Sequence, residues 1–583
     1  MLVPSCGLIA AITVLSMTVS AKAVSFPPSL QHRADATPSC RYLPDDAGWP
    51  SWSQWQQLNQ SVGGRLITGR PLAEICYGIN ADGDGCATLR DGWTKEQNYF
   101  PSPVEVMSPL FLNNSCTPFV NTSTSLKSSS CTLGNSPNYA INVSSAADVL
   151  AGLKFAQRKN LRLIVKSTGH DYLGRSDGKG SLSLWTHNLK TISFLNYTST
   201  GYTGPAVRLG AGVQAFEIYA AVASRGLRIT GGLCPTVGVA GGYVSGGGHG
   251  PLMGRYGLAA DNSLEFEVVT PDRGYLIASP TQNADLFWAL NGGGGSAYGV
   301  VLSQTTRVHA DGPVAAATVT FNNTDNETYW AAIDAWHATI PSFNRIPGAS
   351  SSFSVSKESV LIRARVPDGN TTAIKDTLAP FLAQVDLPYT QDITYEPTFY
   401  DYFKSTTADL PYGDFPTNTL IGGRLIPLPV VSSQNQRAEL VSTIRDIVSS
   451  DTGFFSMAGN SADLSVSHTG VDNAVLPAWR NMAYTLGISV LWDPAAPLDL
   501  LGRLNDEVLT GQDKLRHLTP GSGIYINEAT LDSEYWREDF YGPNYKRLLA
   551  IKRKYDSGVL LYGPGVVGSD YWTVASDGRL CRA

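Results

Sequence analysis

The chain has 583 residues, of which 43% are hydrophobic and 16% charged, and its formal net charge at pH 7 is -6. This length is enough for two or more domains that each bury a core. The acidic balance and the lack of a basic stripe argue against nucleic acid as a partner. Beyond the N-terminal segment, no apolar run approaches the length that a bilayer requires, so we expect no membrane partner.

The N-terminus has the features of a secretory signal. Residues 8–17 form an apolar run, and Ala21-Lys22-Ala23 matches an A-x-A cleavage site, so we predict a signal peptide over 1–23 and an extracellular protein. Sequons typical of secreted glycoproteins occur at Asn59, Asn113, Asn121, Asn142, Asn196, Asn322, Asn326 and Asn370.

The cysteine count also fits an oxidising compartment. The chain has 8 cysteines, and removing Cys6 with the signal leaves an odd number, so one cysteine has no partner within the chain. Most of them fall in residues 24–135, which we interpret as an irregular extension stapled by disulfides. Cys234 stands alone in a glycine-rich loop and is our candidate for the unpaired thiol.

From about residue 139 the helix and strand patterns alternate. Ser145 and Asp148 fit a capping box ahead of a helix whose apolar face is Val149, Leu153 and Ala156. Strands are predicted over 161–165, 181–185 and 206–209, and a helix over 215–223.

Two short motifs in this region lack the structural context that they need. Residues 174–178 match G-x-S-x-G, but a strand rather than a helix follows, so Ser176 is not predicted to be an acyl-transfer nucleophile. Residues 210–215 match G-x-G-x-x-A, yet no acidic residue for a ribose follows about twenty positions later. We therefore predict a tight turn there and no nicotinamide cofactor.

Beyond residue 315 the pattern changes. Strands are predicted over 315–321, 353–355, 360–366 and 484–491, and helices over 329–340, 374–385, 436–449 and 538–555. This arrangement indicates antiparallel strands covered by helices on one face. Within 360–366, Ile362, Ala364 and Val366 alternate with Arg363 and Arg365, a pattern typical of a half-solvated sheet face.

Glycine clusters surround one histidine and one cysteine. His170 follows Gly169, and Cys234 opens a second glycine-rich run over 231–262. Repeated glycines let backbone amides approach an anion or a flat ring. Tight turns, a core histidine and an inert buried cysteine remain the alternative on the residues alone. His249 has no second ligand at metal spacing, so we predict no metal site and place it in a loop near the bound group.

Four separate motifs follow one another along the chain. They are Lys166-Ser167-Thr168-Gly169-His170, residues 234–239, residues 285–295 and Tyr525-Ile526-Asn527-Glu528. On these motifs the chain resembles the vanillyl-alcohol-oxidase or PCMH-type FAD-linked oxidoreductases, and among them the berberine-bridge-enzyme-like branch. The resemblance covers about 139–310 and 523–567. It implies FAD held at two points, with His170 bonded to the flavin 8α carbon and Cys234 to C6.

The resemblance also implies a set of residues that contact FAD. Lys166 stands where the family more often has arginine. Lysine retains the positive charge but lacks the bidentate fork of a guanidinium. The predicted cofactor-binding residues are His170, Cys234, Lys166, Ser167, Thr168, Gly169, Asp171, Tyr172, Gly174, Ser176, Val237, Gly238, Gly241, Gly242, Gly246, Gly247, Gly248, Gly250, Gly299, Val300 and Asn527.

The expected fold is α+β, a two-part PCMH-type FAD-binding domain with an inserted substrate domain of antiparallel sheet and helices. Motifs of the flavoprotein family lie on both sides of the segment beyond residue 315, where the pattern of strands and helices changes. We therefore expect this segment to be a domain inserted into the FAD-binding domain. The expected divisions are a signal peptide at 1–23, an extension at 24–135, the FAD-binding domain at 136–312, the substrate domain at 313–515 and a C-terminal segment at 516–583 that completes the FAD domain.

The expected activity is a secreted oxidase that removes a hydride from an alcohol, hemiacetal or amine carbon of a small molecule, with O2 as acceptor. A flavin dehydrogenase using another acceptor, or a non-catalytic secreted binding glycoprotein, are the alternatives. Tyr525 is the predicted base, since Tyr-x-Asn here resembles the family segment that supplies a catalytic tyrosine. Glu528 is its rival, but on a strand Glu528 would point to the opposite face from Tyr525.

Overall fold

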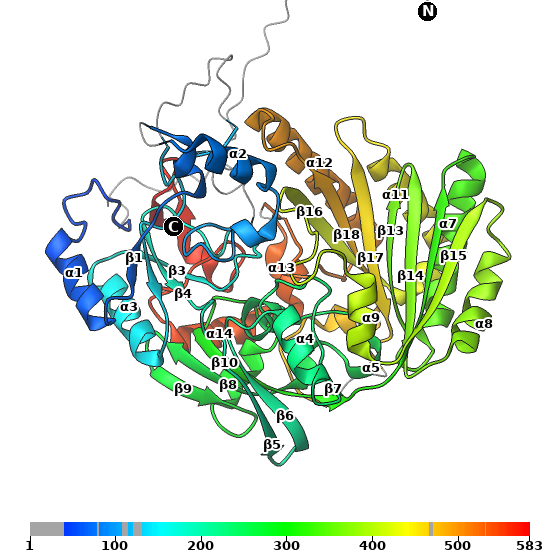
Figure 1. The fold of residues 1–583 in the computed structure, drawn as a ribbon, viewed down its shortest axis with the longest axis horizontal. Coiled ribbons are helices and arrows are strands. Elements are labelled where there is room, and N and C mark those ends of the chain that lie inside the picture. The colour runs from blue at the N-terminus through cyan, green and yellow to red at the C-terminus, as the bar shows by residue number, and fades with distance from the viewer. Residues whose placement is uncertain (1–39, 79–80, 108–114, 120–130, 466–469, 531) are drawn as a thin grey trace, which may run out of the picture. The chain divides into compact units, whose positions relative to one another are not determined.

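The computed structural model describes residues 40–78, 81–107, 115–119, 131–465, 470–530 and 532–583 (Figure 1). The predicted signal peptide and the sequons at Asn113 and Asn121 lie outside these ranges. Within them, no helix has both the length and the apolar character that a membrane span requires.

The N-terminal extension is more regular than predicted. It contains helices α1 (Trp52–Ser61) and α2 (Gly83–Asp91) and the short strand β1 (Leu66–Thr68). Trp55 of α1 is buried and stacks on Tyr139, with ring centroids 4.0 Å apart. The extension therefore packs onto the segment that follows it.

Disulfides staple the extension, as predicted. The pairs are Cys76–Cys86, Cys116–Cys131 and Cys40–Cys581. Cys234 remains a free thiol, as the cysteine count predicted.

A four-stranded sheet with the order β1-β2-β4-β3 comes next. Strand β4 (Ser181–Trp185) pairs in parallel with β2 (Tyr139–Asn142) and β3 (Arg162–Lys166). Helix α3 (Ala146–Arg158) begins at the predicted capping box of Ser145 and Asp148. The apolar face predicted for this helix is buried, so the local pattern alone identified the helix and its orientation.

An antiparallel sheet with the order β5-β6-β10-β8-β9 lies beside it. Its strands are β5 (Ile192–Thr198), β6 (Thr203–Gly210), β8 (Ser263–Thr270), β9 (Gly274–Ala278) and β10 (Val300–Arg307). Its connections carry α4 (Ala215–Ala223), β7 (Leu227–Arg228), α5 (Met253–Tyr256) and α6 (Ala284–Leu290), and β11 (His309–Ala310), which follows β10, pairs with β7. The glycine clusters occupy the connection from β3 to β4 and the connection from α4 to β8.

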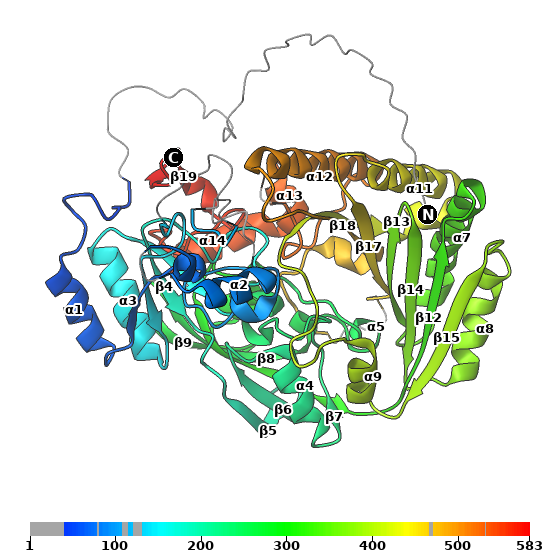
Figure 2. The same cartoon turned by 45° about the horizontal axis from the view of Figure 1, so that its top comes forward.

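The third sheet has seven antiparallel strands in the order β15-β12-β14-β13-β17-β18-β16. These are β12 (Val314–Asn322), β13 (Ser350–Ser356), β14 (Ser359–Pro367), β15 (Tyr389–Glu396), β16 (Thr419–Pro427), β17 (Phe455–Ala462) and β18 (Met482–Leu491). Helices α7 (Asn326–Asn344), α8 (Thr371–Leu382), α11 (Gln434–Val448) and α12 (Leu498–Leu518) cover one face (Figure 2). The short helices α9 (Phe399–Thr406) and α10 (Leu428–Ser432) occupy two connections. The predicted arrangement of antiparallel strands with helices on one face is confirmed.

One side chain of this sheet departs from the predicted pattern. Arg363 is exposed, but Arg365 is buried, at 1% exposure. Its guanidinium donates to Ser350 Oγ at 2.9 Å and to the Tyr402 hydroxyl at 3.1 Å. The second face of β14 is therefore covered at this end, which an alternating sequence pattern cannot reveal.

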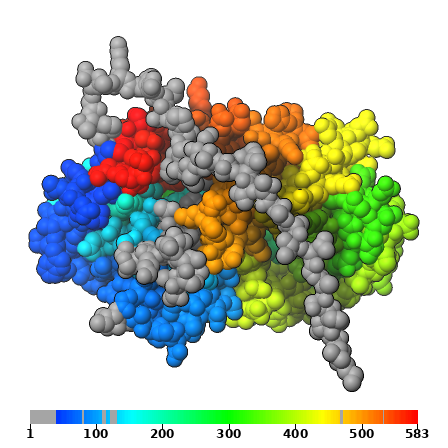
Figure 3. Space-filling view, turned by 90° about the horizontal axis from the view of Figure 1, so that it is seen from above, coloured from blue at the N-terminus to red at the C-terminus, as the bar shows by residue number. Residues whose placement is uncertain are grey.

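The C-terminal segment returns to the first part of the chain. The predicted helix over 538–555 is instead two helices, α13 (Trp536–Tyr541) and α14 (Tyr545–Tyr555), which are separated at Gly542-Pro543 because proline interrupts a helix. Strands β19 (Trp572–Val574) and β20 (Leu580–Arg582) follow. The C-terminal residues, red in Figure 3, lie beside the blue and cyan ones, in agreement with the Cys40–Cys581 bond.

Candidate functional site

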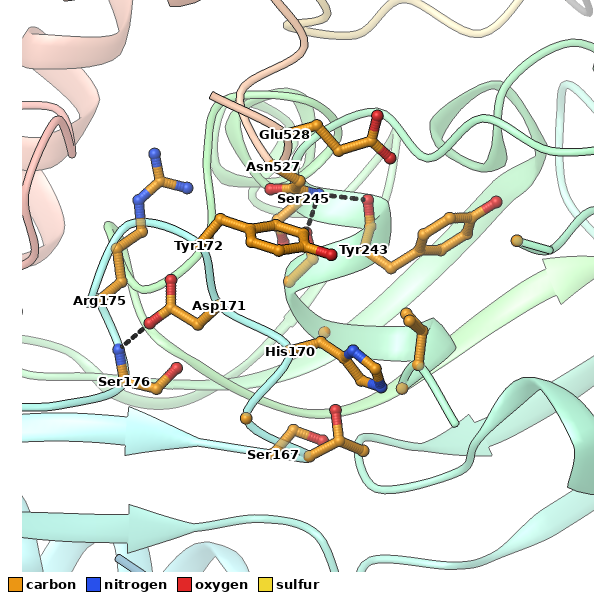
Figure 4. A pocket seen from close by; sticks show the side chains of 18 of the residues that line it. Ser167, His170, Asp171, Tyr172, Arg175, Ser176, Tyr243, Ser245, Asn527 and Glu528 are labelled. Carbon is orange, nitrogen blue, oxygen red and sulfur yellow. Dashed lines mark hydrogen bonds between the residues drawn. The ribbon is translucent and has the colours of Figure 1, made fainter. Parts of the chain in front are cut away.

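A cavity of about 450 Å³ lies where the glycine-rich loops meet the seven-stranded sheet. Small-molecule sites in proteins have volumes of this order. The loop from β3 to β4 forms one wall, and Figure 4 shows His170, Asp171 and Tyr172 along it. Ala458 and Asn460 of β17 line the cavity from the sheet. The cavity is thus shared by two parts of the chain that are far apart in sequence.

His170 projects from the loop after β3. Its Nε2 lies 2.7 Å from Thr236 Oγ1 and 3.9 Å from Cys234 Sγ. Burial, and next the charge of Lys166, lower the pKa of His170 to about 3. The imidazole is therefore neutral at physiological pH and keeps a nitrogen lone pair, which a nucleophile requires.

Cys234 stands in the second glycine cluster, within reach of the same histidine. Its thiol donates to Glu96 Oε1 at 3.4 Å and lies 3.5 Å from Thr236 Oγ1. Burial, and next the charge of Glu96, raise the pKa of Cys234 to about 12. His170 and Cys234, which the sequence motifs assign to one site, lie within 3.9 Å of each other in the structure.

Glu96 completes a group of three possible metal-ligand atoms, with those of His170 and Cys234, that lie within 4.8 Å of one another. No such group was predicted, because no spacing in the sequence connects residue 96 with the other two.

The lining differs from the predicted set at a few positions. Lys166, Gly174, Gly246, Gly247, Gly248, Gly250 and Val300 do not line the cavity, whereas all the other predicted cofactor residues do. Lys166 and Val300 lie on strands, and their neighbours Val165 and Val301 face the cavity instead, since side chains alternate. The Lys166 ammonium donates to the Ser102 carbonyl at 2.6 Å, away from the cavity.

Two of these glycines are explained by close packing. A Cβ on Gly246 would lie 2.3 Å from Asn527 Nδ2, and one on Gly250 would lie 1.8 Å from the Gly231 carbonyl oxygen. Gly246 thus lets the second glycine cluster pack against the turn at Asn527, and Gly250 lets the two ends of the cluster approach each other closely. Gly242 differs, because it lines the cavity and a Cβ there would have no atom within 4 Å.

Tyr525 and Glu528 line the same cavity, which corrects the prediction that a strand would separate them. Residues 525–528 form a turn in which the Glu528 amide donates to the Tyr525 carbonyl at 2.9 Å. Asn527 Nδ2 donates to the Tyr525 hydroxyl at 3.0 Å. Burial, and next the charge of Glu528, raise the pKa of Tyr525 well above its ordinary value.

His249 joins this turn. Its Nε2 lies 3.0 Å from Glu528 Oε1, and its ring packs edge-on against Tyr525 with centroids 4.8 Å apart. The other ring nitrogen, Nδ1, is buried and has no hydrogen-bond partner among the residues that the structure describes. The position predicted for His249, in a loop near the bound group, agrees with its place in the cavity wall.

Several lining residues were not predicted. Glu96, Ile421, Ala458 and Asn460 come from segments without a motif, and tertiary packing alone brings them to the cavity. Arg175 lines the cavity as well and was not predicted either. Arg175 had a signal, since it lies five positions after His170 in the same glycine-rich loop.

Comparisons with known proteins agree with this geometry. Residues 137–278 match the model of the FAD binding domain family, and 524–560 match the berberine and berberine-like family. The VAO-type flavoprotein oxidase VAO615 of Thermothelomyces thermophilus is 42% identical, over 94% of this chain and 96% of the relative. The chain belongs to the VAO-type family of FAD-linked oxidoreductases.

Further relatives extend the agreement to the whole fold of this flavoprotein. The bifunctional decalin synthase calF of Penicillium decumbens is 41% identical, over 93% of this chain and 96% of its own. The crystal structure of the VAO-type flavoprotein MtVAO615 from Myceliophthora thermophila C1 superposes with a TM-score of 0.88 at 41% identity, covering 94% of this chain and 100% of the other. The predicted family, the α+β fold and the class of enzyme are confirmed.

The residues of the cavity fit FAD, the cofactor of this family. Gly241 and Gly242 leave an open cradle for a flat ring, and Arg175 Nη2 is buried without a hydrogen-bond partner in the described part of the chain. Arg175 lines the cavity and offers a cation to an anionic diphosphate. The flavoprotein thus has both a surface for the ring and a charge for the phosphates.

Proposed function

We propose that this flavoprotein is a secreted oxidase that removes a hydride from an alcohol, hemiacetal or amine carbon of a small molecule, with O2 as electron acceptor. The observation that carries the proposal is the shared cavity. His170 and Cys234 line this cavity together with Tyr525 and Glu528. A substrate in it would contact the flavin and a proton acceptor together.

The proposed cofactor is FAD attached at two points. His170 and Cys234 lie side by side, with 3.9 Å between Nε2 and Sγ, which supports two links to the same edge of one ring system. When bound, FAD supplies the two-electron acceptor for the hydride. The chain contributes the two attachment atoms and the glycine cradle that holds the ring.

We further propose that Glu528, rather than Tyr525, takes the substrate proton. The raised pKa of Tyr525 keeps its hydroxyl protonated, so the phenol is a poor proton acceptor, whereas a carboxylate offers two oxygens that accept. His249 holds the Glu528 carboxylate at 3.0 Å and fixes its direction. Tyr525 remains in contact with the cavity and, as a hydroxyl donor, would orient the substrate oxygen.

The domain divisions and the location are proposals as well. The seven-stranded sheet lies between the two parts that the family models match, which supports a substrate domain at 313–515 inserted into the FAD domain. Three disulfides support an oxidising compartment and hence secretion. The sequons at Asn196, Asn322, Asn326 and Asn370 are exposed, as glycosylation requires.

Purified protein tests these proposals in two steps. Denatured protein should retain the flavin absorption band and carry the added mass of FAD, whereas release of free FAD would contradict covalent attachment. A panel of alcohols, sugars and amines is then screened for bleaching of the flavin without O2, and for peroxide when O2 is admitted.

The same screen separates the alternatives. Bleaching without peroxide formation in air, reversed by an added quinone, would favour a dehydrogenase. Colourless protein would favour a non-catalytic binding glycoprotein.

A further inference from the structure

A carboxylate from the N-terminal extension reaches the cysteine of the flavin site. Glu96 begins a short 3-10 helix, Glu96–Asn98, and lies outside the residues that match the FAD binding domain family. It is 2% exposed, and its Oε1 accepts the hydrogen bond of Cys234 Sγ at 3.4 Å. The extension, which also lines the cavity with Met107, therefore contributes a titratable group to the site.

The Cys234 thiol needs such a neighbour in order to react. The thiolate is the nucleophilic form, but burial holds the pKa of Cys234 at about 12, so the free thiolate is scarce near pH 7. Burial also raises the pKa of Glu96 to about 7, with Asp414 acting in the same direction. A carboxylate with this proton affinity, in contact with the thiol, is matched to accept its proton as the sulfur reacts.

We propose that Glu96 accepts the thiol proton of Cys234 when the cysteine sulfur bonds to the flavin ring. The inference rests on the proposed double attachment. The Sγ–C6 bond forms while the S–H bond and the C6–H bond break. Two electrons leave through the ring and reduce O2, which takes up two protons and becomes hydrogen peroxide. Thiol, ring C–H and O2 thus give the thioether and peroxide, and the oxidised flavin is restored.

Thr236 does not take this role. Its hydroxyl contacts both Cys234 Sγ, at 3.5 Å, and His170 Nε2, at 2.7 Å, so it connects the two attachment residues. A hydroxyl is a far weaker proton acceptor than a carboxylate. Thr236 is instead a positioning residue that fixes the thiol and the imidazole relative to each other.

The test is the rate at which Cys234 becomes linked to FAD. Wild-type and Glu96→Gln chains are produced in a riboflavin-starved host and supplied with FAD in air. At intervals the protein is denatured without reduction and alkylated, and the Cys234 peptide is scored by mass for flavin or for alkylation. We expect Glu96→Gln to slow the linkage by about 100-fold or more, the usual effect of losing a general base. The link to His170 should still form, and Glu96→Asp should restore part of the rate.

Glu105→Gln is the matched control. Glu105 belongs to the same extension, is 3% exposed and has a pKa that burial raises to about 7, but it accepts from the Leu72 amide rather than from Cys234. Normal linkage in this variant shows that a buried carboxyl of the extension can be neutralised without harm.

Linkage at the wild-type rate in Glu96→Gln, or equal slowing in Glu105→Gln, overturns the inference. An alkylatable Cys234 in mature wild-type protein instead overturns the double attachment itself, so the two failures are distinguishable. If the starved chains do not fold, the same peptide is scored in protein matured with FAD during expression, and full linkage of Glu96→Gln there counts against the inference.

Discussion

Replacing Glu528 by glutamine should separate proton transfer from substrate binding. The amide keeps the size of the side chain and a polar contact with His249, 3.0 Å away in the wild type, but it accepts no proton. A general base contributes about 100- to 10,000-fold to a rate, so we expect flavin reduction to slow by at least about 100-fold. That is about 2.7 kcal/mol on the barrier.

Tyr525→Phe is the companion variant. A phenol with a pKa near 10 is only about 0.1% ionised at pH 7, and burial raises the pKa of Tyr525 further. Loss of the hydroxyl should therefore remove one hydrogen bond to substrate, and we expect less than about a 10-fold effect on flavin reduction.

The assay is anaerobic stopped-flow bleaching of the flavin with a substrate from the panel screen. It isolates reduction from the later reaction with O2. Near wild-type reduction in Glu528→Gln, together with a loss of about 100-fold in Tyr525→Phe, would refute the reasoning and return the base role to Tyr525.

Two further predictions concern the cradle and the core. Gly242→Val should put a side chain into open cavity space and abolish FAD retention, measured by flavin absorbance. Gly558→Val is the control, because a Cβ there also meets no atom within 4 Å but the residue is exposed, so this variant should retain FAD. FAD retention by both variants would contradict the role of the glycine cradle. Burial lowers the pKa of His337 from 6.5 to about 4, so between these pH values the unfolded chain binds a proton that the folded chain does not bind. The free energy of unfolding should therefore fall by up to about 3 kcal/mol as the pH drops through this range. His337→Asn should flatten this pH slope in urea unfolding, and an unchanged slope would assign it to other groups.

Local patterns in the sequence predicted the elements that carry a clear period. The helix over 215–223 and the strands β12 and β14 lie where the pattern placed them. Strand β17 was missed because it contains Gly459 and other small residues. In the sheet Gly459 pairs with Phe353, whose ring would lie 2.1 Å from a Cβ at that position. The glycine that weakens the strand signal is required by the neighbouring ring.

The residues of the site also divide into those that a local motif predicted and those that only the tertiary structure reveals. His170 and Cys234 were predicted because each lies in a local motif, and Tyr525 because it lies in a third. Glu96 has no motif, and its position depends on how the extension folds back. The direction of Glu528 was wrong for a related reason, since a turn and a strand cannot be distinguished in four residues of this composition.

The bond between Cys40 and Cys581 joins positions 541 residues apart, so nearly the whole described chain is one closed covalent ring. A protease that cuts once inside this ring, for example in the substrate sheet, produces two chain ends but no separate fragments. The two sequence-distant parts of the flavin cavity then remain one molecule until the disulfide is reduced. After a single nick the two pieces thus separate only on a reducing gel.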